Sequence, residues 1–564
     1  MDTDKGKLIR ESFNPALPLC VLGGESFCSA SGLAPQPARR RDPAFCQAVV
    51  AAAYPLSPRS LHSIVPARYS PLAMRSDYRI DTDKIFEFHP SAREILERLA
   101  AAGYEAVLIG GVVRDAVRSI LDPSIPFSPR EVDIATSALP QEVRRLFRDC
   151  PIVGVGEEFG VLVIAAPDSQ QYEVATFRTE ADYDGRWPGK VELVRDLAGD
   201  VKRRDLTING LAATRDGTVI DLVGGIEDLK SGRIRAIGDP QVRFAEDYLR
   251  MLRAVRFACR IGGVIDPATA AAIAENANKI ESISWERIRD ELLRTLATPA
   301  SARGIELLDQ FGLLEHILPE VTAMKGVPQP EEYHPEGDVY VHTLLAARIS
   351  DQFVRDPLVK LAILLHDIGK PRALARNDGV NMGGHEAISA RMARRIGARL
   401  HMSRHEIARL AFLVKNHMRI ADFPKMGRGK QVRFVSEGSV EGGTASSTMR
   451  LRDRYPLFFD LLQVLVADCE ACAHKSSGWA PILRETLRVV DHMERVCDLK
   501  KARALVDGHV LIEMGARPGP RLGRVLEEVH DRILSGEICT REEAISVAMG
   551  LFSVDLEGNE DRQE

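Results

Sequence analysis

Four short stretches in the first half of the chain combine glycines, paired carboxylates and closely spaced arginines. In the first, Gly110 and Gly111 separate a predicted strand at 106–109 from a predicted helix that begins near Val112. Such a glycine turn lets the backbone approach a phosphate closely, and Arg114 adds a charge-assisted donor one turn into the helix. A glycine pair is equally compatible with a plain strand-to-helix connection, so the other stretches have to decide.

The second stretch contains Glu131 and Asp133, which alternate on a predicted strand at 132–135. Both carboxylates then point to the same face and can hold two Mg²⁺ ions. An isolated pair of this kind is more often a solvated acidic surface, but its position 20 residues after Gly111 favours a metal site. Glu173, on a later predicted strand, is a further candidate carboxylate whose face the sequence does not fix.

The third stretch is Arg203-Arg204-Asp205. Two neighbouring guanidinium groups beside a polar segment are suited to clamping phosphates and ribose. The alternative is an ordinary solvated turn of a helix.

In the fourth stretch, residues 246–256, Asp247, Arg250, Arg253 and Arg256 recur every three residues. On a helix this spacing makes Asp247 and Arg250 neighbours and turns Arg256 toward another face. An acceptor beside a donor matches the amino group and ring nitrogen that cytosine and adenine share. The alternative is a helix ion pair worth a few tenths of a kcal/mol.

A second set of residues falls in a helical region with the order and spacing of an HD phosphohydrolase metal site. Its members are His342, His366, Asp367, His385, His417 and Asp468. In residues 364–370 the polar ligands interrupt an apolar helix, which is hard to explain unless they bind something. We therefore expect one or two divalent metals that activate water.

Together these motifs make residues 85–330 similar to the class II tRNA nucleotidyltransferases, which are the CCA-adding enzymes, and to the related bacterial poly(A) polymerases. The resemblance implies template-independent addition of C, C and A to the 3′ end of tRNA from CTP and ATP, with Mg²⁺. It places Gly111 and Arg114 on the nucleotide, Glu131 and Asp133 on Mg²⁺, Arg204 on phosphates, Asp247 and Arg250 on the base, and Arg253 and Arg256 on further nucleotide groups. For the HD domain it implies a metal-dependent phosphatase or 2′,3′-cyclic phosphodiesterase using Mn²⁺, Ni²⁺, Mg²⁺ or Fe.

Two features depart from the family pattern. The family has Asp where this chain has Glu131, and the loop 122–130 with its three prolines is longer than usual. A poly(A) polymerase, or an enzyme that adds only CC or only A, is an alternative because the head motifs are shared, although the acidic end of the chain lacks the basic tail that a processive polymerase would find useful. An HD phosphohydrolase with a degenerate RNA-binding head is the other alternative.

The elements that must position these residues indicate a two-part fold. Predicted strands at 106–109, 132–135, 160–165, 172–177 and 218–222 alternate with helices, and helical periodicity takes over after about residue 241. The expected fold is an α/β head with a nucleotidyltransferase-type mixed sheet, followed by an elongated all-α body. The predicted divisions are a disordered extension at 1–73 (or a chain that starts at Met74), the head at 74–225, a helical nucleotide-reading and RNA-binding region at 226–330, the HD-type domain at 331–480 and a helical tail at 481–564.

The composition narrows the class of protein further. A net charge of -5 argues against a globally basic nucleic-acid coat, so contact with tRNA has to be local. Nine cysteines show no framework spacing, and the pair Cys469 and Cys472 lacks a second pair for a zinc site. Reduced thiols in a cytoplasmic protein are expected. No apolar run is long enough to span a bilayer, and the sequence does not indicate an oligomeric state.

Overall fold

The computed structural model describes residues 75–154, 159–184, 187–332, 334–438, 451–472, 478–495 and 504–560. The predicted disordered extension at 1–73 lies outside these residues. Within them, no helix is both long enough and apolar enough to cross a membrane.

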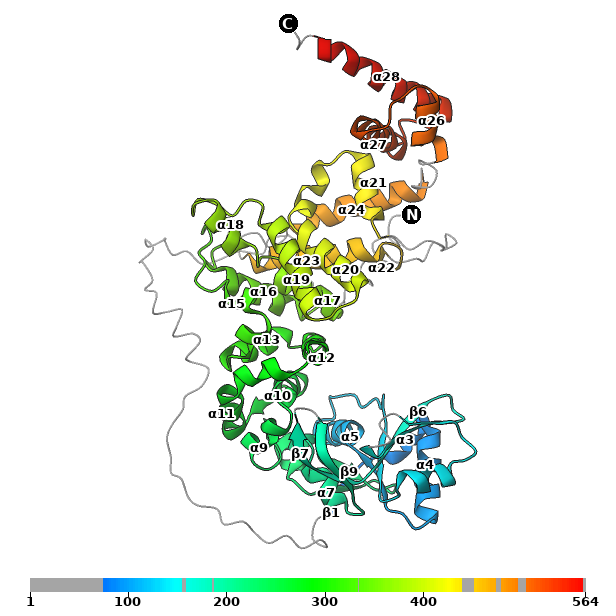
Figure 1. The fold of residues 1–564 in the computed structure, drawn as a ribbon, viewed down its shortest axis with the longest axis vertical. Helices are drawn as coiled ribbons and strands as arrows, with labels where there is room; N and C mark the ends of the chain where they lie inside the picture. Colours follow the sequence, from blue (N-terminus) through cyan, green and yellow to red (C-terminus); the bar gives the residue numbers. More distant parts are fainter. Residues whose placement is uncertain are drawn as a thin grey trace, which may run out of the picture. The chain divides into compact units, whose positions relative to one another are not determined.

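The N-terminal part is built on one mixed sheet of eight strands in the order β1-β10-β9-β2-β3-β6-β5-β4 (Figure 1). The strands of this sheet are β1 (Arg75–Arg79), β2 (Ala106–Ile109), β3 (Asp133–Thr136), β4 (Ile152–Val153), β5 (Val161–Ala165), β6 (Gln171–Thr176), β9 (Leu211–Ala213) and β10 (Thr218–Asp221). Two smaller pairs join β7 (Arg178–Asp184) to β8 (Trp187–Leu193) and β11 (Arg233–Ile234) to β12 (Val264–Ile265). The central strand β3 runs antiparallel to β2 and parallel to β6.

Helices accompany this sheet and bury its apolar side chains. They are α3 (Thr82–Phe88), α4 (Pro90–Ala101), α5 (Gly111–Leu121), α6 (Pro140–Leu146), α7 (Leu197–Lys202), the 3-10 helix η3 (Thr207–Asn209) and α8 (Gly225–Lys230). Leu108, Ile134 and Val174 from the three central strands share one core cluster with Val113 and Val117 of α5. The strand ends beside α5 are therefore held by a packed core.

The remainder of the described chain is helical, apart from β12. Its helices are α9 (Pro240–Glu246), α10 (Leu249–Ile261), α11 (Pro267–Glu275), η4 (Ala277–Ser282), α12 (Trp285–Leu296), α13 (Ser301–Gln310), α14 (Leu313–Ile317), α15 (Pro319–Thr322), α16 (Val339–Ser350), α17 (Pro357–Leu365), α18 (Lys370–Arg376), α19 (His385–Arg399), α20 (Arg404–Asn416), η5 (Arg419–Lys425), α21 (Arg428–Ser436), α22 (Leu451–Arg454), α23 (Pro456–Ala471), α24 (Trp479–Arg495), α26 (Gly508–Glu513), α27 (Pro520–Ser535) and α28 (Arg541–Glu560). A mixed-sheet head followed by helices confirms the predicted fold class.

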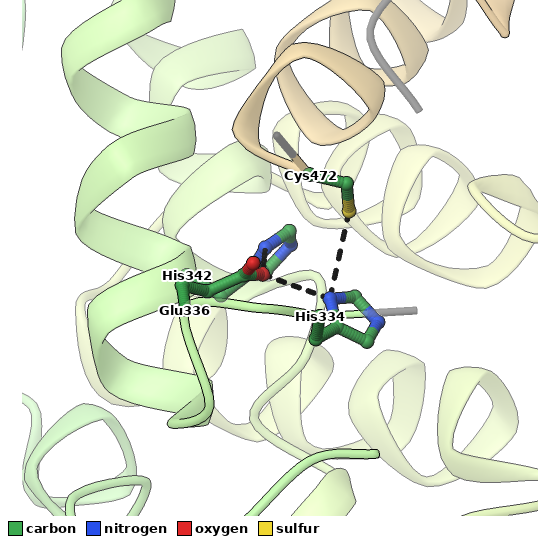
Figure 2. Close-up of side chains that lie close together, drawn as sticks. All are labelled: His334, Glu336, His342 and Cys472. Atoms are coloured by element: carbon green, nitrogen blue, oxygen red, sulfur yellow. Dashed lines mark hydrogen bonds and ion pairs between the residues drawn. The ribbon is translucent and has the colours of Figure 1, made fainter. Parts of the chain in front are cut away.

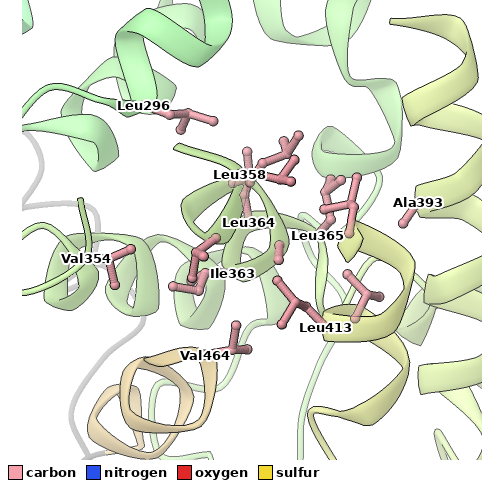
Figure 3. Packing of buried hydrophobic residues seen from close by; sticks show 14 of the residues in the cluster. Leu296, Val354, Leu358, Ile363, Leu364, Leu365, Ala393, Leu413 and Val464 are labelled. Carbon is pink, nitrogen blue, oxygen red and sulfur yellow. The ribbon is translucent and has the colours of Figure 1, made fainter. Parts of the chain in front are cut away.

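The most deeply buried of these helices is α17. Pro357 occupies its first turn, and the Asp356 carboxylate accepts a hydrogen bond from the Leu358 backbone N–H at 2.8 Å, which caps the helix. Its side chains are buried all round, as Figure 3 shows for Leu358, Ile363 and Leu364. An apolar helix fixed on every side gives a rigid mount for the His-Asp pair that follows it.

Close packing just after that pair makes Gly369 a sensitive position. A Cβ atom there would lie 2.5 Å from the His385 carbonyl oxygen and 2.6 Å from the Ser389 nitrogen. We expect Gly369→Ala to destabilise the protein by about 1–3 kcal/mol through overpacking, which lowers the melting temperature. Gly523→Ala in α27 is the control, since no atom lies within 4 Å of its added Cβ. Equal melting temperatures for the two variants would contradict this packing.

Candidate functional sites

Two strands of the head bring carboxylates to one place. Asp133 is the first residue of β3, and Glu173 of β6 stands beside it in the parallel register. Registered neighbours on adjacent strands point to the same face, so Glu173, whose face the sequence left open, lies on the side of Asp133. Glu131 lies two residues before Asp133 and outside β3, so the two do not alternate on one strand as predicted, but the charge of Glu131 also acts on Asp133.

The electrostatics of this cluster fit a divalent cation. Desolvation of its carboxyl by the surrounding protein raises the pKa of Asp133 although the residue is exposed, the Glu173 carboxylate raises it further and Arg204 only partly opposes this, which leaves the pKa at about 6. Carboxylates that resist joint ionisation are stabilised when a divalent metal lies between them. Glu131, Asp133 and Glu173 could therefore hold such an ion.

The glycine turn lies against this cluster. Gly110 has φ 78°, and a Cβ at this position would lie 3.5 Å from Nη1 of Arg204 and 3.7 Å from Oδ2 of Asp133. Glycine adopts this backbone conformation without strain, and its missing side chain leaves space in front of the carboxylate. Arg204 itself is held by Asp200, whose Oδ2 accepts from its Nη2 at 3.2 Å.

Arg114 is placed less openly than the sequence suggested. Its side chain is buried and donates to Oδ1 of Asn209 at 2.7 Å and to the Asp115 carboxylate at 2.8 and 2.9 Å. The guanidinium lies 4.9 Å from the centre of the Phe257 ring. Arg114 therefore connects α5 with η3 and α10, and its contact with a nucleotide stays a prediction, as does that of Gly111.

The helix predicted through residues 246–256 is wrong at its start. α9 ends at Glu246, Asp247 is extended with φ −159° and ψ 102°, and α10 begins only at Leu249. The Asp247 carboxylate accepts from the Leu249 backbone N–H at 3.1 Å and from Nη2 of Arg287 at 2.6 Å. An Asp side chain that caps the next turn competes with helix continuation, which is the physical reason for the break.

Arg250 follows in the first turn of α10. It forms an ion pair with Glu246, and it donates to the backbone carbonyls of Arg243 at 2.9 Å and Arg203 at 3.1 Å. The link to Arg203 ties α10 to the arginine stretch of the head. Asp247 and Arg250 thus flank the junction of two helices instead of sharing one helix face.

The two other arginines of α10 converge on a buried carboxylate that the sequence did not reveal. Glu291 of α12 is 2% exposed and lies 2.7 Å from Nε of Arg256 and 3.6 Å from Nη1 of Arg253. Nε of Arg253 also donates to Oδ2 of Asp205 at 2.6 Å. Burial lowers the pKa of Arg256 to about 10, so it stays charged at neutral pH.

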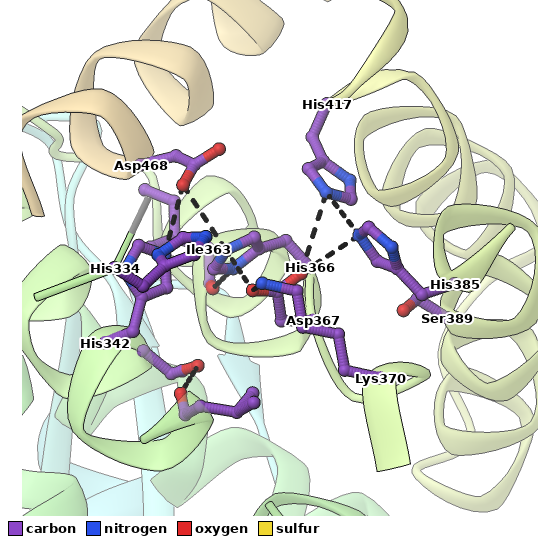
Figure 4. Close-up of polar contacts among 12 residues, drawn as sticks. His334, His342, Ile363, His366, Asp367, Lys370, His385, Ser389, His417 and Asp468 are labelled. Atoms are coloured by element: carbon purple, nitrogen blue, oxygen red, sulfur yellow. Dashed lines mark hydrogen bonds and ion pairs between the residues drawn. The ribbon is translucent and has the colours of Figure 1, made fainter. Parts of the chain in front are cut away.

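All six predicted HD residues come together in the helical body (Figure 4). His342 lies on α16, His385 opens α19, and Asp468 lies near the end of α23. His366 and His417 are the residues that end α17 and α20, and Asp367 follows His366. Five separate helices therefore contribute to one buried cluster.

The backbone fixes how three of these imidazoles are oriented. Nδ1 of His366, His417 and His385 lies 2.6, 2.7 and 3.0 Å from the carbonyl oxygens of Ile363, Val414 and Met382. A carbonyl oxygen can only accept, so each Nδ1 carries the proton and each Nε2 keeps its lone pair. This is the usual second-shell arrangement of histidines that bind metals.

The Nε2 atoms face carboxylates at short range. Oδ1 of Asp367 is 3.2 Å from Nε2 of His385 and 3.7 Å from Nε2 of His417. Oδ1 of Asp468 is 3.0 Å from Nε2 of His342 and 3.8 Å from Nε2 of His366. These distances divide the six residues into two adjoining ligand groups, of which His366 and Asp367 are the link.

Protonation states also suit a metal. Burial, and after it the neighbouring imidazole of His366, lower the pKa of His417 to about 4, so the His417 imidazole is neutral and able to coordinate at pH 7. Among the described residues, Nε2 of His366 and Oδ1 of Asp367 are buried without a hydrogen-bond partner of good geometry. Unsatisfied buried atoms are costly, and a divalent cation would satisfy both.

A family model described as "Poly A polymerase head domain" matches residues 106–235, one described as "Probable RNA and SrmB- binding site of polymerase A" matches residues 264–325, and one described as "HD domain" matches residues 339–438. The CCA-adding enzyme of Limosilactobacillus reuteri (strain DSM 20016) is 33% identical over 455 residues, which cover 80% of this chain and 93% of that enzyme. The chain belongs to the family of CCA-adding enzymes. The resemblance noted from the motifs is thereby confirmed, and the head and HD domain types imply the use of divalent metals.

Other CCA-adding enzymes extend this comparison. The Levilactobacillus brevis enzyme is 47% identical over 226 residues, which cover 40% of this chain and 54% of that enzyme. A crystal structure of the Bacillus stearothermophilus CCA-adding enzyme in complex with CTP has a TM-score of 0.55 and 25% identity, and the match covers 84% of this chain and 98% of that one. The Thermotoga maritima CCA-adding enzyme complexed with tRNA shares the fold, with a TM-score of 0.50 and 18% identity over 84% of this chain and 98% of that one.

The head carboxylates can be tested directly. We expect Asp133→Ala to reduce nucleotide addition by more than about 100-fold, because it removes one of the carboxylates that could hold the divalent cation. Glu131→Asp should keep activity, and Glu173→Gln should raise the Mg²⁺ concentration needed for half-maximal rate.

The measurement is the initial rate of nucleotide incorporation as Mg²⁺ is varied. Asp149→Ala is the control, since this head carboxylate pairs with Arg98 on the protein surface. An Asp133→Ala enzyme that keeps more than a hundredth of the rate would refute the assignment of this carboxylate.

Proposed function

We propose that this chain adds C, C and A to the 3′ end of tRNA, without a nucleic-acid template, from CTP and ATP. The observation that carries the proposal is the convergence at one strand end of Asp133, Glu173, the Gly110 turn and Arg204. Membership of the CCA-adding enzymes supports the same reaction. A cytoplasmic location remains a prediction from the sequence.

Each residue of the head site has its own proposed role in nucleotide addition. We assign Mg²⁺ to Glu131 and Asp133, with Glu173 as a third carboxylate, and when bound it would neutralise phosphate charge and favour ionisation of the attacking hydroxyl. Arg204 faces the same space and is suited to hold phosphate oxygens. The open turn at Gly110 leaves room for the triphosphate.

The junction between α9 and α10 is the proposed base reader. Asp247 is fixed by Arg287 and by the Leu249 N–H, and Arg250 lies in the next turn. A rigid acceptor close to a rigid donor suits the amino group and ring nitrogen common to cytosine and adenine, and mismatches the edges of uracil and guanine. Arg253 and Arg256 continue along the same helix as further nucleotide contacts.

We propose a second activity for the HD cluster, a metal-dependent phosphatase or 2′,3′-cyclic phosphodiesterase. The specific observation is the pair of unsatisfied buried atoms at His366 and Asp367. Nitrogen and oxygen ligands together are compatible with Mn²⁺, Ni²⁺, Mg²⁺ or Fe²⁺. When bound, such a metal would lower the pKa of a water molecule.

One experiment separates these functions. The purified chain is incubated with tRNA lacking its 3′ CCA and with CTP, ATP or both, and the products are sequenced. CTP alone should give the CC end, and CTP with ATP should give the CCA end. A long tail from ATP alone would identify a poly(A) polymerase, arrest at CC would identify a partial enzyme, and no extension would leave the HD reaction as the main activity.

Base choice gives a sharper test of Asp247. We expect Asp247→Ala to slow CTP and ATP addition by roughly 10- to 150-fold, the effect of losing a charge-assisted hydrogen bond worth about 1.5–3 kcal/mol, and to relax discrimination against UTP and GTP. The measurement is kcat/KM for all four nucleotides. Asp290→Ala on α12 is the matched control, because it removes an exposed ion pair with Arg289. Unchanged selectivity with full activity would show that Asp247 is only the structural partner of Arg287.

The HD cluster and the head should be separable. We expect His366→Ala to abolish divalent-metal-dependent hydrolysis of a 2′,3′-cyclic phosphate while CCA addition continues, since the strands that carry the head carboxylates pack in a different core from the helices that carry the HD ligands. Both reactions are assayed on one preparation after its melting temperature has been checked. An equal fall in both activities at an unchanged melting temperature would show that the sites depend on each other.

A further inference from the structure

Four side chains form another compact group beside the HD cluster (Figure 2). His334 and Glu336 belong to the loop that precedes α16, His342 lies on α16, and Cys472 ends α23. Nδ1 of His334 and Nδ1 of His342 lie 2.9 and 2.7 Å from Oε1 of Glu336, and Sγ of Cys472 lies 3.5 Å from Nδ1 of His334. All four candidate ligand atoms lie within 4.8 Å of one another.

The loop holds its two ligands in place by its own backbone. The N–H of Gly337 donates to the carbonyl of His334 at 2.9 Å, and Gly337 has φ 76°. This tight turn places Nδ1 of His334 beside Oε1 of Glu336. The next residue, Asp338, caps α16 by accepting from the Val341 N–H at 3.0 Å, so His342 is fixed as well.

The chemistry of the four groups differs from that of the HD cluster. Two imidazole nitrogens, one carboxylate oxygen and one sulfur are the ligand types that Zn²⁺ binds in tetrahedral sites, whereas Mg²⁺ and Mn²⁺ prefer oxygen. A thiolate and a carboxylate would also neutralise the charge of the ion. The HD residues listed above contribute no sulfur.

One atom of the group lacks a partner. Oε2 of Glu336 is buried and has no hydrogen-bond partner in the part of the chain that the structure describes. The Glu336 side chain is only 5% exposed. A buried carboxylate oxygen left without a donor is costly, and a cation among these four residues removes that cost.

The group is distinct from the HD cluster although it shares His342. Nε2 of His342 faces Asp468 at 3.0 Å, whereas Nδ1 faces Glu336. A carboxylate that merely oriented His342 for the HD metal would be a second-shell partner and would need neither a second histidine nor a cysteine. The presence of His334 and Cys472 at bonding range calls for a further explanation.

We propose that His334, Glu336, His342 and Cys472 form a thiolate-containing Zn²⁺ site separate from the HD cluster. A zinc ion on Nδ1 of His342 would change the protonation and basicity of Nε2 on the same ring. Metal occupancy of this site and of the HD cluster is therefore coupled through that imidazole. The zinc also ties the loop before α16 to the end of α23.

Cobalt substitution tests this site in the full-length protein. Chelator-treated protein is titrated with Co²⁺, which reports a thiolate ligand by a near-ultraviolet charge-transfer band. We expect the band in the wild type and in His417→Ala, which alters only the HD cluster, and its loss in Cys472→Ser. Cys469→Ser, three residues earlier on α23, is the matched control and should keep the band.

Zinc binding gives an independent measure. Competition with a chromophoric chelator should show more than about 100-fold weaker Zn²⁺ binding at one site in His334→Ala, a larger loss than second-shell changes normally cause. Circular dichroism checks that each variant is folded, and His334→Ala replaces Cys472→Ser if the latter is not. Absence of the band in the wild type, its survival in Cys472→Ser, or wild-type zinc affinity in His334→Ala would overturn the proposal.

Discussion

The burial of one carboxylate, Glu291, constrains the orientation of α10, the helix proposed to contact the nucleotide. A buried charge must be paired, and Glu291 is paired with Arg253 and Arg256 of α10. Arg253 in turn binds Asp205 of the head, so a continuous chain of alternating charges connects α12, α10 and the arginine stretch. The arginines proposed to contact nucleotide are therefore already held by protein carboxylates, which limits their movement and presents α10 in a single orientation.

The orientation of the HD histidines depends instead on the ends of two helices. His366 and His417 stand where α17 and α20 finish, and their Nδ1 atoms lie at bonding distance from carbonyl groups of the final turns. Those carbonyls have no partner within their own helix, so the histidines satisfy them and are oriented by doing so. The same contact therefore ends each helix and orients its histidine. Because α17 is packed rigidly on all sides, the position of His366 is fixed as well.

Local patterns in the sequence predicted much of this structure. The strand at 106–109 was recognisable as an apolar run that ends at the glycine pair, and His366 and Asp367 as polar residues that directly follow an apolar helix. Asp247 was placed on a helix because three-residue spacing cannot show that its carboxylate will cap the following turn. Glu291 was missed, and Cys472 was set aside as a metal ligand, for another reason: their partners lie far away in the chain, and nothing in their own neighbourhood marks them as buried.

The ion pairs that connect Asp205, Arg253, Glu291 and Arg256 also affect the order in which this region can form during synthesis. Glu291 comes 86 residues after Asp205, so at about 5–20 residues per second the ribosome needs roughly 4–17 s to supply it. During that interval the sheet can form and Arg253 can pair with Asp205, but Arg256 still lacks the Glu291 carboxylate that later fixes it. The set of arginines proposed to contact the nucleotide is therefore fixed in a late step of synthesis, after translation has already moved into the helical half of the chain.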